Sequence, residues 1–461
     1  MKWKSVKQKY FGPKSFYKSA IAIALPVMAQ MLIQSLVSLV DNFMVAGLGD
    51  IKMSGVNVAG QILYIFQVLV NAICTAGGIF MSQYFGADNE RGMKQSLCFK
   101  FILGFISIGI YMFCCMVIPY QILSLMVIHN TDAEAILAVG TQYMFIMGFS
   151  GIPATISGIL ASSLREIGDV KPPLIISVCA TFLNTFLDWV FIYGKFGFPA
   201  MEVRGAAIAT LIAMSIQMAA FMIYIRKKKP PFLICNRKDI FIDWTVFRRI
   251  LRKCFMTVFS EMILVVSGTY MTALFNSRGG ADVVSGMASS FAIANLFFVA
   301  FSGITTAVGV LLGKTMGHGD LHQAREEKDW LLMAAIMLGM IMSAVGMLTV
   351  LLIPLVFGSL SHSAQAICTE MVFGISLFMP VMVYVNAQYA VSRAGGDTIS
   401  VLCVDCLTTV LLIGIGILFT TKYTQLGPVA MYMICRCVDF IRIIVAGVLL
   451  KKERWLRNLA A

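Results

Sequence analysis

Residues 16–44 have the sequence FYKSAIAIALPVMAQMLIQSLVSLVDNFM, an apolar run long enough to cross the roughly 30 Å hydrocarbon core of a bilayer as a helix. A carboxylate, Asp41, lies near the end of this run. A second run, residues 172–194 (PPLIISVCATFLNTFLDWVFIYG), carries Asn184 and Asp188 at a similar distance from its own end. Because inserting a carboxylate into a membrane helix costs about 2.5–3.5 kcal/mol, such a residue is expected to have a function. Two carboxylates at matched depth predict a cation site.

The composition of the whole chain is that of a membrane protein. Of its 461 residues, 59% are apolar and 13% are charged, whereas a soluble protein carries about 25% charged residues. Almost no sequence is left for a soluble domain. We predict an all-α membrane protein with twelve transmembrane helices, at residues 16–44, 54–84, 95–119, 135–163, 172–194, 204–225, 254–276, 283–314, 330–358, 365–392, 399–421 and 427–450.

The net charge of +13 is concentrated in the loops of one side. Most Lys and Arg residues lie in the N-terminal tail, the central loop, the C-terminal tail and the short loops that share their side of the membrane. The positive-inside rule then predicts that both termini are cytoplasmic. We expect an integral protein of the cell (inner or plasma) membrane, monomeric, whose basic loops contact anionic lipid headgroups. The same topology argues against nucleic acid as a partner.

The two halves of the chain repeat the same motifs. Pairs at a constant offset of 231 residues are Gly78 with Gly309, Gly86 with Gly317 and Lys94 with Arg325. REIGD at residues 165–169 corresponds to RAGGD at 393–397, and Gly205 corresponds to Gly427. Six spans per half give both halves the same orientation, which predicts parallel repeats about an axis along the membrane normal. We predict an N-lobe (1–225), a cytoplasmic linker (226–253) and a C-lobe (254–461).

The polar residues of the first lobe fit an ion site. Asn184 and Asp188 are four residues apart and share one helix face. At 1.5 Å per residue, Asp41, Asp188 and Thr210 lie roughly 8–10 Å below the outer membrane boundary. Two carboxylates, an amide oxygen and a hydroxyl suit a small hard cation, so Asp41, Asn184 and Asp188 are candidate Na⁺ ligands. Crowded carboxylates also favour uptake of a proton, and both chemistries stay open.

Other residues inside the predicted spans have weaker signals. Gln34 lies seven residues before Asp41 on the same face, where it could line a cavity. Pro26 removes a backbone hydrogen bond in mid-span and predicts a hinge in the first helix. Glu261 is the clearest carboxylate inside the second lobe, a candidate for substrate or proton binding. The i, i+3, i+6 spacing of Arg436, Asp439 and Arg442 predicts that Asp439 neutralises its neighbours.

Several motifs together resemble the multidrug and toxin extrusion (MATE) family. They are Leu25-Pro26 with Gln30 and Gln34, VDNFMVAGLGD at 40–50, QYFGADN at 83–89, GAAIAT at 205–210 and RAGGDT at 393–398. The resemblance covers roughly residues 14–456. It implies a twelve-helix, V-shaped exporter that exchanges Na⁺ or H⁺ for an organic, often cationic compound by alternating access of two lobes.

The resemblance also implies roles for particular residues. It assigns Asp41, Asn184, Asp188 and Thr210 to an ion-coupling site in the N-lobe. Glu261 resembles the glutamate found in span 7 of the Na⁺-linked bacterial branch of the family. That branch also has an acidic residue in span 10, where this sequence has only Asn386 and Gln388. Asn386 is therefore a further candidate for substrate binding.

We predict a secondary active antiporter that exports cationic, amphipathic organic compounds and needs no cofactor besides its coupling ion. One alternative is a flippase for lipid-linked precursors of the same superfamily, and another is a membrane receptor that does not transport. We expect no enzyme, because no nucleophile, metal set or acid–base pair is evident. Replacing Asp41 by Asn separates the antiporter from the receptor, since only the antiporter loses ion-dependent activity.

Overall fold

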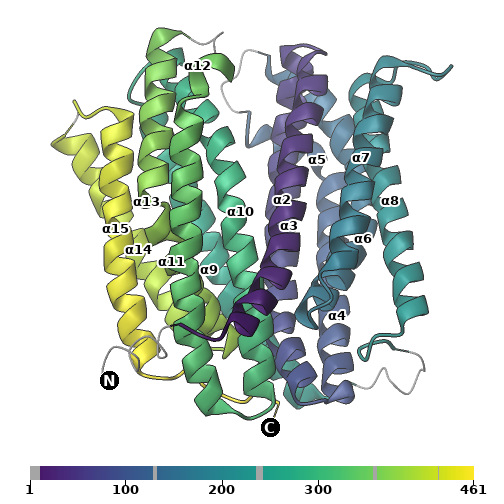
Figure 1. Ribbon diagram of the computed structural model, residues 1–461. Coiled ribbons are helices and arrows are strands. Elements are labelled where there is room, and N and C mark those ends of the chain that lie inside the picture. The colour runs from purple at the N-terminus through teal and green to yellow at the C-terminus, as the bar shows by residue number, and fades with distance from the viewer. Residues whose placement is uncertain (1–10, 128–131, 235–241, 357–360, 424, 461) are drawn as a thin grey trace. The chain divides into compact units, whose positions relative to one another are not determined.

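Long apolar helices make up nearly all of the structure (Figure 1). The computed structural model describes residues 11–127, 132–234, 242–356, 361–423 and 425–460. The basic residues of the N-terminal tail before residue 11, which support the predicted cytoplasmic N-terminus, lie outside this range. Regular secondary structure in the described residues is entirely helical, as the sequence predicts.

Twelve long helices and two short ones form in the described residues. The long helices are α2 (Lys14–Ala46), α3 (Asp50–Gly86), α4 (Glu90–Met116), α6 (Ala133–Glu166), α7 (Lys171–Tyr193), α8 (Glu202–Lys228), α9 (Trp244–Asn276), α10 (Ala281–Gly317), α11 (Leu321–Val350), α13 (His362–Ala394), α14 (Thr398–Thr421) and α15 (Pro428–Lys451). The short helices are α5 (Pro119–Ser124) and α12 (Ile353–Val356). Each of the twelve apolar segments predicted from the sequence overlaps one long helix, and the predicted segments 95–119 and 330–358 also reach into the short helices α5 and α12.

Eleven of these helices are long and apolar enough to cross a membrane. The twelfth, α15, has a comparable length of 24 residues but carries Arg436, Asp439 and Arg442 in its middle. Several helices extend past the apolar runs that predict them. α9 begins at Trp244, ten residues before the predicted span, because its first turns contain basic residues that form helix well but do not belong in lipid.

The helix starts repeat between the two halves of the chain. Asn89 caps α4 by accepting a hydrogen bond from the Gly92 backbone N–H (2.8 Å), and Asp320 caps α11 by accepting one from Gln323 (2.9 Å). The two caps are separated by the same 231 residues as the glycine pairs of the sequence. Each cap satisfies a backbone donor that would otherwise have no partner.

The chain forms two compact units. The N-unit consists of residues 29–81 and 89–254, and the C-unit of residues 1–28, 82–88 and 255–461. The core of the C-unit is built mainly from the apolar faces of α10, α11 and α13. α2 contributes to both units, and the division falls between Met28 and Ala29, two residues after Pro26. The lobe boundaries predicted from span counting stay a prediction.

Candidate functional site

A cluster of oxygen atoms in the N-unit contains the residues predicted to bind an ion. Three helices supply it: α2 carries Asp41, α7 carries Asn184 and Asp188, and α8 carries Thr210. Asn184 Nδ2 donates to Asp188 Oδ2 (3.1 Å) and approaches Thr210 Oγ1 at 3.5 Å. Thr185 Oγ1, one residue along α7, donates to Asp41 Oδ1 (2.7 Å). The predicted residues therefore form two hydrogen-bonded groups, which meet at the neighbouring residues Asn184 and Thr185 of α7.

Asp188 is the least satisfied member of this cluster. Its side chain is 3% exposed, and its Oδ1 has no hydrogen-bond partner in the part of the chain that the structure describes. A buried carboxylate oxygen without a donor is costly, because the charge has lost its water without a replacement. A cation can compensate this carboxylate in two ways. A metal ion would coordinate the free oxygen, and a proton would neutralise the charge. The arrangement fits either one.

Two predicted residues of α2 lie outside the hydrogen-bonded cluster. Gln34 is half-buried two helical turns before Asp41, and no hydrogen bond joins it to the cluster within the described residues. Pro26 lies inside α2, which continues as a helix on both sides of it. The hinge at this proline stays a prediction.

A second polar cluster surrounds a cavity of about 240 Å³ in the C-unit. Glu261 and Asn386, the two substrate candidates of the second lobe, both line it. Glu261 Oε1 forms an ion pair with Arg393 Nη2 (2.8 Å), and Asn386 Oδ1 accepts a hydrogen bond from Thr305 Oγ1 (2.7 Å). The structure thus places the two candidates at one site, with partners that the sequence did not suggest.

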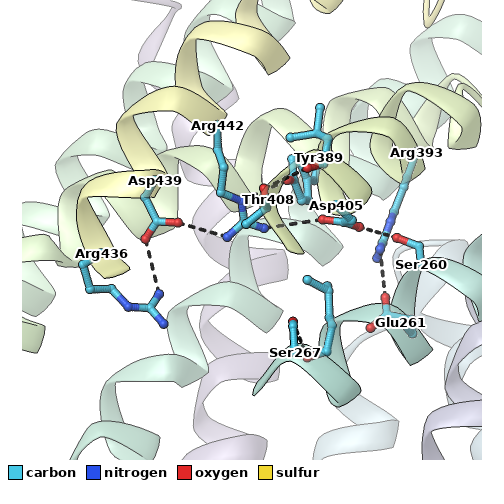
Figure 2. A network of polar contacts seen from close by, with 12 residues as sticks. Ser260, Glu261, Ser267, Tyr389, Arg393, Asp405, Thr408, Arg436, Asp439 and Arg442 are labelled. Atoms are coloured by element: carbon cyan, nitrogen blue, oxygen red, sulfur yellow. Dashed lines mark hydrogen bonds and ion pairs between the residues drawn. The ribbon is translucent and has the colours of Figure 1, made fainter. Parts of the chain in front are cut away.

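Charged residues of α14 and α15 continue this cluster (Figure 2). Asp439 accepts from Arg442 Nη1 (3.0 Å) and from Arg436 Nη1 (3.3 Å), as their spacing on the helix predicts. Arg442 also donates to the Tyr389 hydroxyl (3.1 Å) and lies 3.5 Å from Asp405 Oδ1. Asp405, which is fully buried, accepts a further hydrogen bond from Ser260.

One buried cation was missed by the sequence reasoning, which placed the basic residues of the first half in loops. Lys100 is fully buried on α4, where its Nζ forms an ion pair with Glu166 Oε2 (2.5 Å) and bonds Ser162 and Ser163. Lys100 lies inside the third predicted span, residues 95–119, and this position could have identified it from the sequence. Thr185 was missed as well, although it directly follows Asn184 in the sequence.

Proteins of known sequence and proteins of known structure both resemble this chain. The chain is 28% identical to a probable multidrug resistance protein NorM of Thermotoga maritima over 304 residues, which are 66% of this chain and 64% of that protein. The match therefore spans just under two thirds of this relative. Among solved structures, a MATE protein in the straight conformation has a TM-score of 0.84 at 18% identity, covering 97% of both chains.

A third similar protein is a transporter of the MOP superfamily from Pyrococcus furiosus, whose structure was described as having a binding pocket of reversed polarity. It has a TM-score of 0.80 at 20% identity and covers 95% of this chain and 98% of its own. These structures show that the fold is the MATE fold. The sequence model of the family MatE matches residues 26–190 and 257–419, most of both halves. The chain therefore belongs to the MatE family.

Proposed function

We propose that this protein is a secondary active antiporter that exports organic, cationic and amphipathic compounds in exchange for Na⁺ or H⁺. The observation that carries the proposal is the oxygen cluster of the N-unit, in which a buried Asp188 oxygen has no partner among the described residues. Inside a membrane helix, such an oxygen is expected to bind an ion rather than to stabilise the fold. The name of the Thermotoga relative, a multidrug resistance protein, supports export of drug-like compounds.

Binding of the ion would change the packing of three helices. An ion at the free Asp188 oxygen attracts Asp41 of α2 as a second anionic ligand, in competition with the Thr185 hydroxyl. α2 can respond at Pro26, where the backbone ladder lacks one hydrogen bond. Similar solved proteins have been captured in both a straight and a bent conformation. Ion binding and substrate release would thus be coupled through the shape of α2.

The proposed topology follows from the distribution of basic loops. Both termini are cytoplasmic, and the protein acts as a monomer in the cell membrane, with its basic loops against anionic lipids. Export then needs an inward gradient of the coupling ion.

The test is efflux of a fluorescent organic cation from proteoliposomes under a Na⁺ gradient or a pH gradient, imposed separately. We expect one gradient to drive efflux and Asp41→Asn to abolish it. Asp50→Asn is the matched control, because Asp50 is exposed at the start of α3 and no hydrogen bond or ion pair joins it to the cluster among the described residues. Efflux that persists in Asp41→Asn at the rate of the parent would contradict the proposed ion site.

A flippase for lipid-linked precursors is the second candidate. It is favoured by one observation: three arginines, Arg393, Arg436 and Arg442, line the cavity of the C-unit, as a phosphate-bearing substrate would require. The Pyrococcus relative with reversed pocket polarity supports such diversity within the superfamily. Movement of a fluorescent phospholipid or polyprenyl phosphate between leaflets, with no ion-driven dye efflux, would establish the flippase instead.

A further inference from the structure

A separate pocket of the C-unit, of about 440 Å³, lies between the starts of α2 and α11 and is called here the α2–α11 pocket. It shares no lining residue with the cavity at Glu261. Two aromatic rings, Phe16 of α2 and Trp330 of α11, form part of its wall and meet edge to face with their centroids 5.1 Å apart. The carboxylates of Asp320 and Glu326 form another part. Among the described residues, no Lys or Arg lines it.

The protein does not neutralise the negative charge of the α2–α11 pocket. Neither Asp320 nor Glu326 forms an ion pair in the part of the chain that the structure describes. Behind the wall, Glu327 is 4% exposed and accepts hydrogen bonds from two neutral groups, Thr315 Oγ1 (2.7 Å) and Gln323 Nε2 (2.8 Å). Because Gln323 also lines the pocket, this buried charge is one hydrogen bond away from it. A pocket surrounded by charges of one sign attracts a ligand of the opposite sign.

The rings and the carboxylates lie at different depths. Phe16 begins the predicted span 16–44 and Trp330 begins the predicted span 330–358, so both rings belong to the edge of the apolar runs. Asp320 and Glu326 precede Trp330 on α11, which places them roughly 15 Å and 6 Å further towards the loop at 1.5 Å per residue. A ligand that fills the pocket therefore has its polar end at the carboxylates and its apolar end at the rings.

The first half of the chain contains the same aromatic contact. At the offset of 231 residues, Phe247 of α9 corresponds to Phe16. Phe99 of α4 corresponds to Trp330, and the rings of Phe99 and Phe247 also meet edge to face, with centroids 5.2 Å apart. The packing of an aromatic pair at this position is therefore a property of the repeat.

The acidic positions of the second half are neutral in the first. The same offset places Gln95 at the position of Glu326. It places Ser96 at the position of Glu327. Gln95 Oε1 accepts a hydrogen bond from the backbone N–H of Asp243 (3.0 Å), next to the start of α9. A helix pair of this architecture thus forms with neutral side chains at both positions, so packing does not explain the two glutamates.

We propose that the α2–α11 pocket binds an amphipathic organic ammonium compound, with its cationic group at the two carboxylates and its apolar body along the two rings. Aromatic rings and carboxylates are the partners that an ammonium group finds in proteins. A ligand that also bears a phosphate fits poorly, because the phosphate would lie beside several carboxylates with no Lys or Arg in the described lining. The pocket is distinct from the two polar clusters of the candidate functional site, and binding to it does not depend on antiport.

The test is photolabelling of the full-length protein in phosphatidylglycerol nanodiscs, with no ion gradient. The cationic probe is an alkyltrimethylammonium with a diazirine in its chain, and the neutral probe has a carbon atom in place of the charged nitrogen. Mass spectrometry locates the labelled peptides, and the dependence on probe concentration gives half-saturation. We expect labelling of residues 13–19 and 320–330, with half-saturation at an about tenfold lower concentration for the cationic probe.

Two variants test the two parts of the wall. Asp320→Asn combined with Glu326→Gln should raise the half-saturating concentration of the cationic probe about tenfold and leave the neutral probe unaffected. The helix cap is kept, because Asn89 serves as the cap at the equivalent position of α4. Trp330→Leu should raise the half-saturating concentration of the cationic probe about threefold. Glu134→Gln is the matched control, because Glu134 is exposed in the first turn of α6 in the N-unit.

Equal labelling of the pocket by the two probes, or unchanged half-saturation in the double variant, overturns the proposal. Added phosphatidylethanolamine then separates two sources of an ammonium group. If the parent and the double variant still differ in its presence, the result supports a free organic compound. If that difference is lost, the lipid headgroup occupies the pocket and the assignment is overturned. Labelling is measured without a gradient, so its outcome is independent of whether Asp41→Asn abolishes efflux.

Discussion

At the scale of single residues, the two units hold their buried acids differently. Asp405 and Asp439 of the C-unit accept hydrogen bonds from arginines and a serine, so their charges are compensated. Asp188 of the N-unit accepts only one hydrogen bond, from the neutral Asn184, and keeps a free oxygen among the described residues. A compensated acid needs no further cation, whereas an uncompensated buried acid is a candidate site for one.

Asp188→Asn should therefore separate stability from ion binding. We expect the variant to unfold at the same temperature as the parent or higher, because the amide removes a buried charge that has no full set of partners. Saturation of a Na⁺ site with ion at 100 times its dissociation constant adds about 2.7 kcal/mol, a shift that only the parent can show. Thermal unfolding in detergent with and without Na⁺, and at two pH values, measures both. A large destabilisation of the variant with no ion response in the parent would contradict the site.

The sequence predicts part of this site, and the missing part has a physical reason. Asn184 and Asp188 share a helix face, and Asp41 lies at a matched depth in its own span. Helix periodicity and span length were therefore enough to predict that the three residues lie near one another. The partners of Glu261 could not be found in this way. Arg393 is at the end of another helix, 132 residues away, and its ion pair depends on how α9 and α13 pack. Helix periodicity contains no information about which faces meet.

At the scale of elements, one of the glycine pairs of the sequence, Gly86 with Gly317, lies at a close helix contact in the C-unit. The segment 82–88 at the end of α3 packs against the end of α10. A Cβ atom on Gly86 would overlap the Lys314 carbonyl, and one on Gly317 would overlap the Gln83 carbonyl. This repeated glycine pair thus marks a close contact between the ends of two helices at equivalent positions in the repeat. Apolar runs predict where a helix spans lipid, but they do not show where two helix backbones touch.

Gly317→Ala should destabilise the protein by about 1–3 kcal/mol, because the new methyl group meets a backbone atom that cannot rotate away. Gly309→Ala on the same helix is the control, since no atom lies within 4 Å of its added Cβ. There we expect no loss, or a gain of up to about 1 kcal/mol from helix propensity. Thermal unfolding midpoints of the two variants in one detergent give the comparison. Equal midpoints would show that the crossing at Gly317 is open.

At the scale of the whole chain, the two repeats share a backbone pattern and differ in charge. Capping residues and crossing glycines recur at one offset, while the acidic cluster lies in the first half and the arginine cluster in the second. The sequence shows the repeat because caps and glycines are demanded by the backbone. It shows the difference between paired and unpaired charges less clearly, because a charged residue inside an apolar run looks the same in the sequence in both cases.

The end of the chain closes over one end of the C-unit and contributes to its stability. Trp455 is 1% exposed, and the backbone N–H of Leu459 donates to Gln83 Oε1 (2.6 Å). Gln83 in turn donates from Nε2 to the Ala394 carbonyl (2.8 Å), so the tail is tied to the ends of α3 and α13. Truncation of a buried Trp to Ala typically costs about 3–5 kcal/mol, which predicts a marked fall in the unfolding midpoint of Trp455→Ala. Trp244→Ala is the control, because Trp244 is 63% exposed and should lose little. Equal midpoints for the two variants would mean that the tail lies on the C-unit without stabilising it.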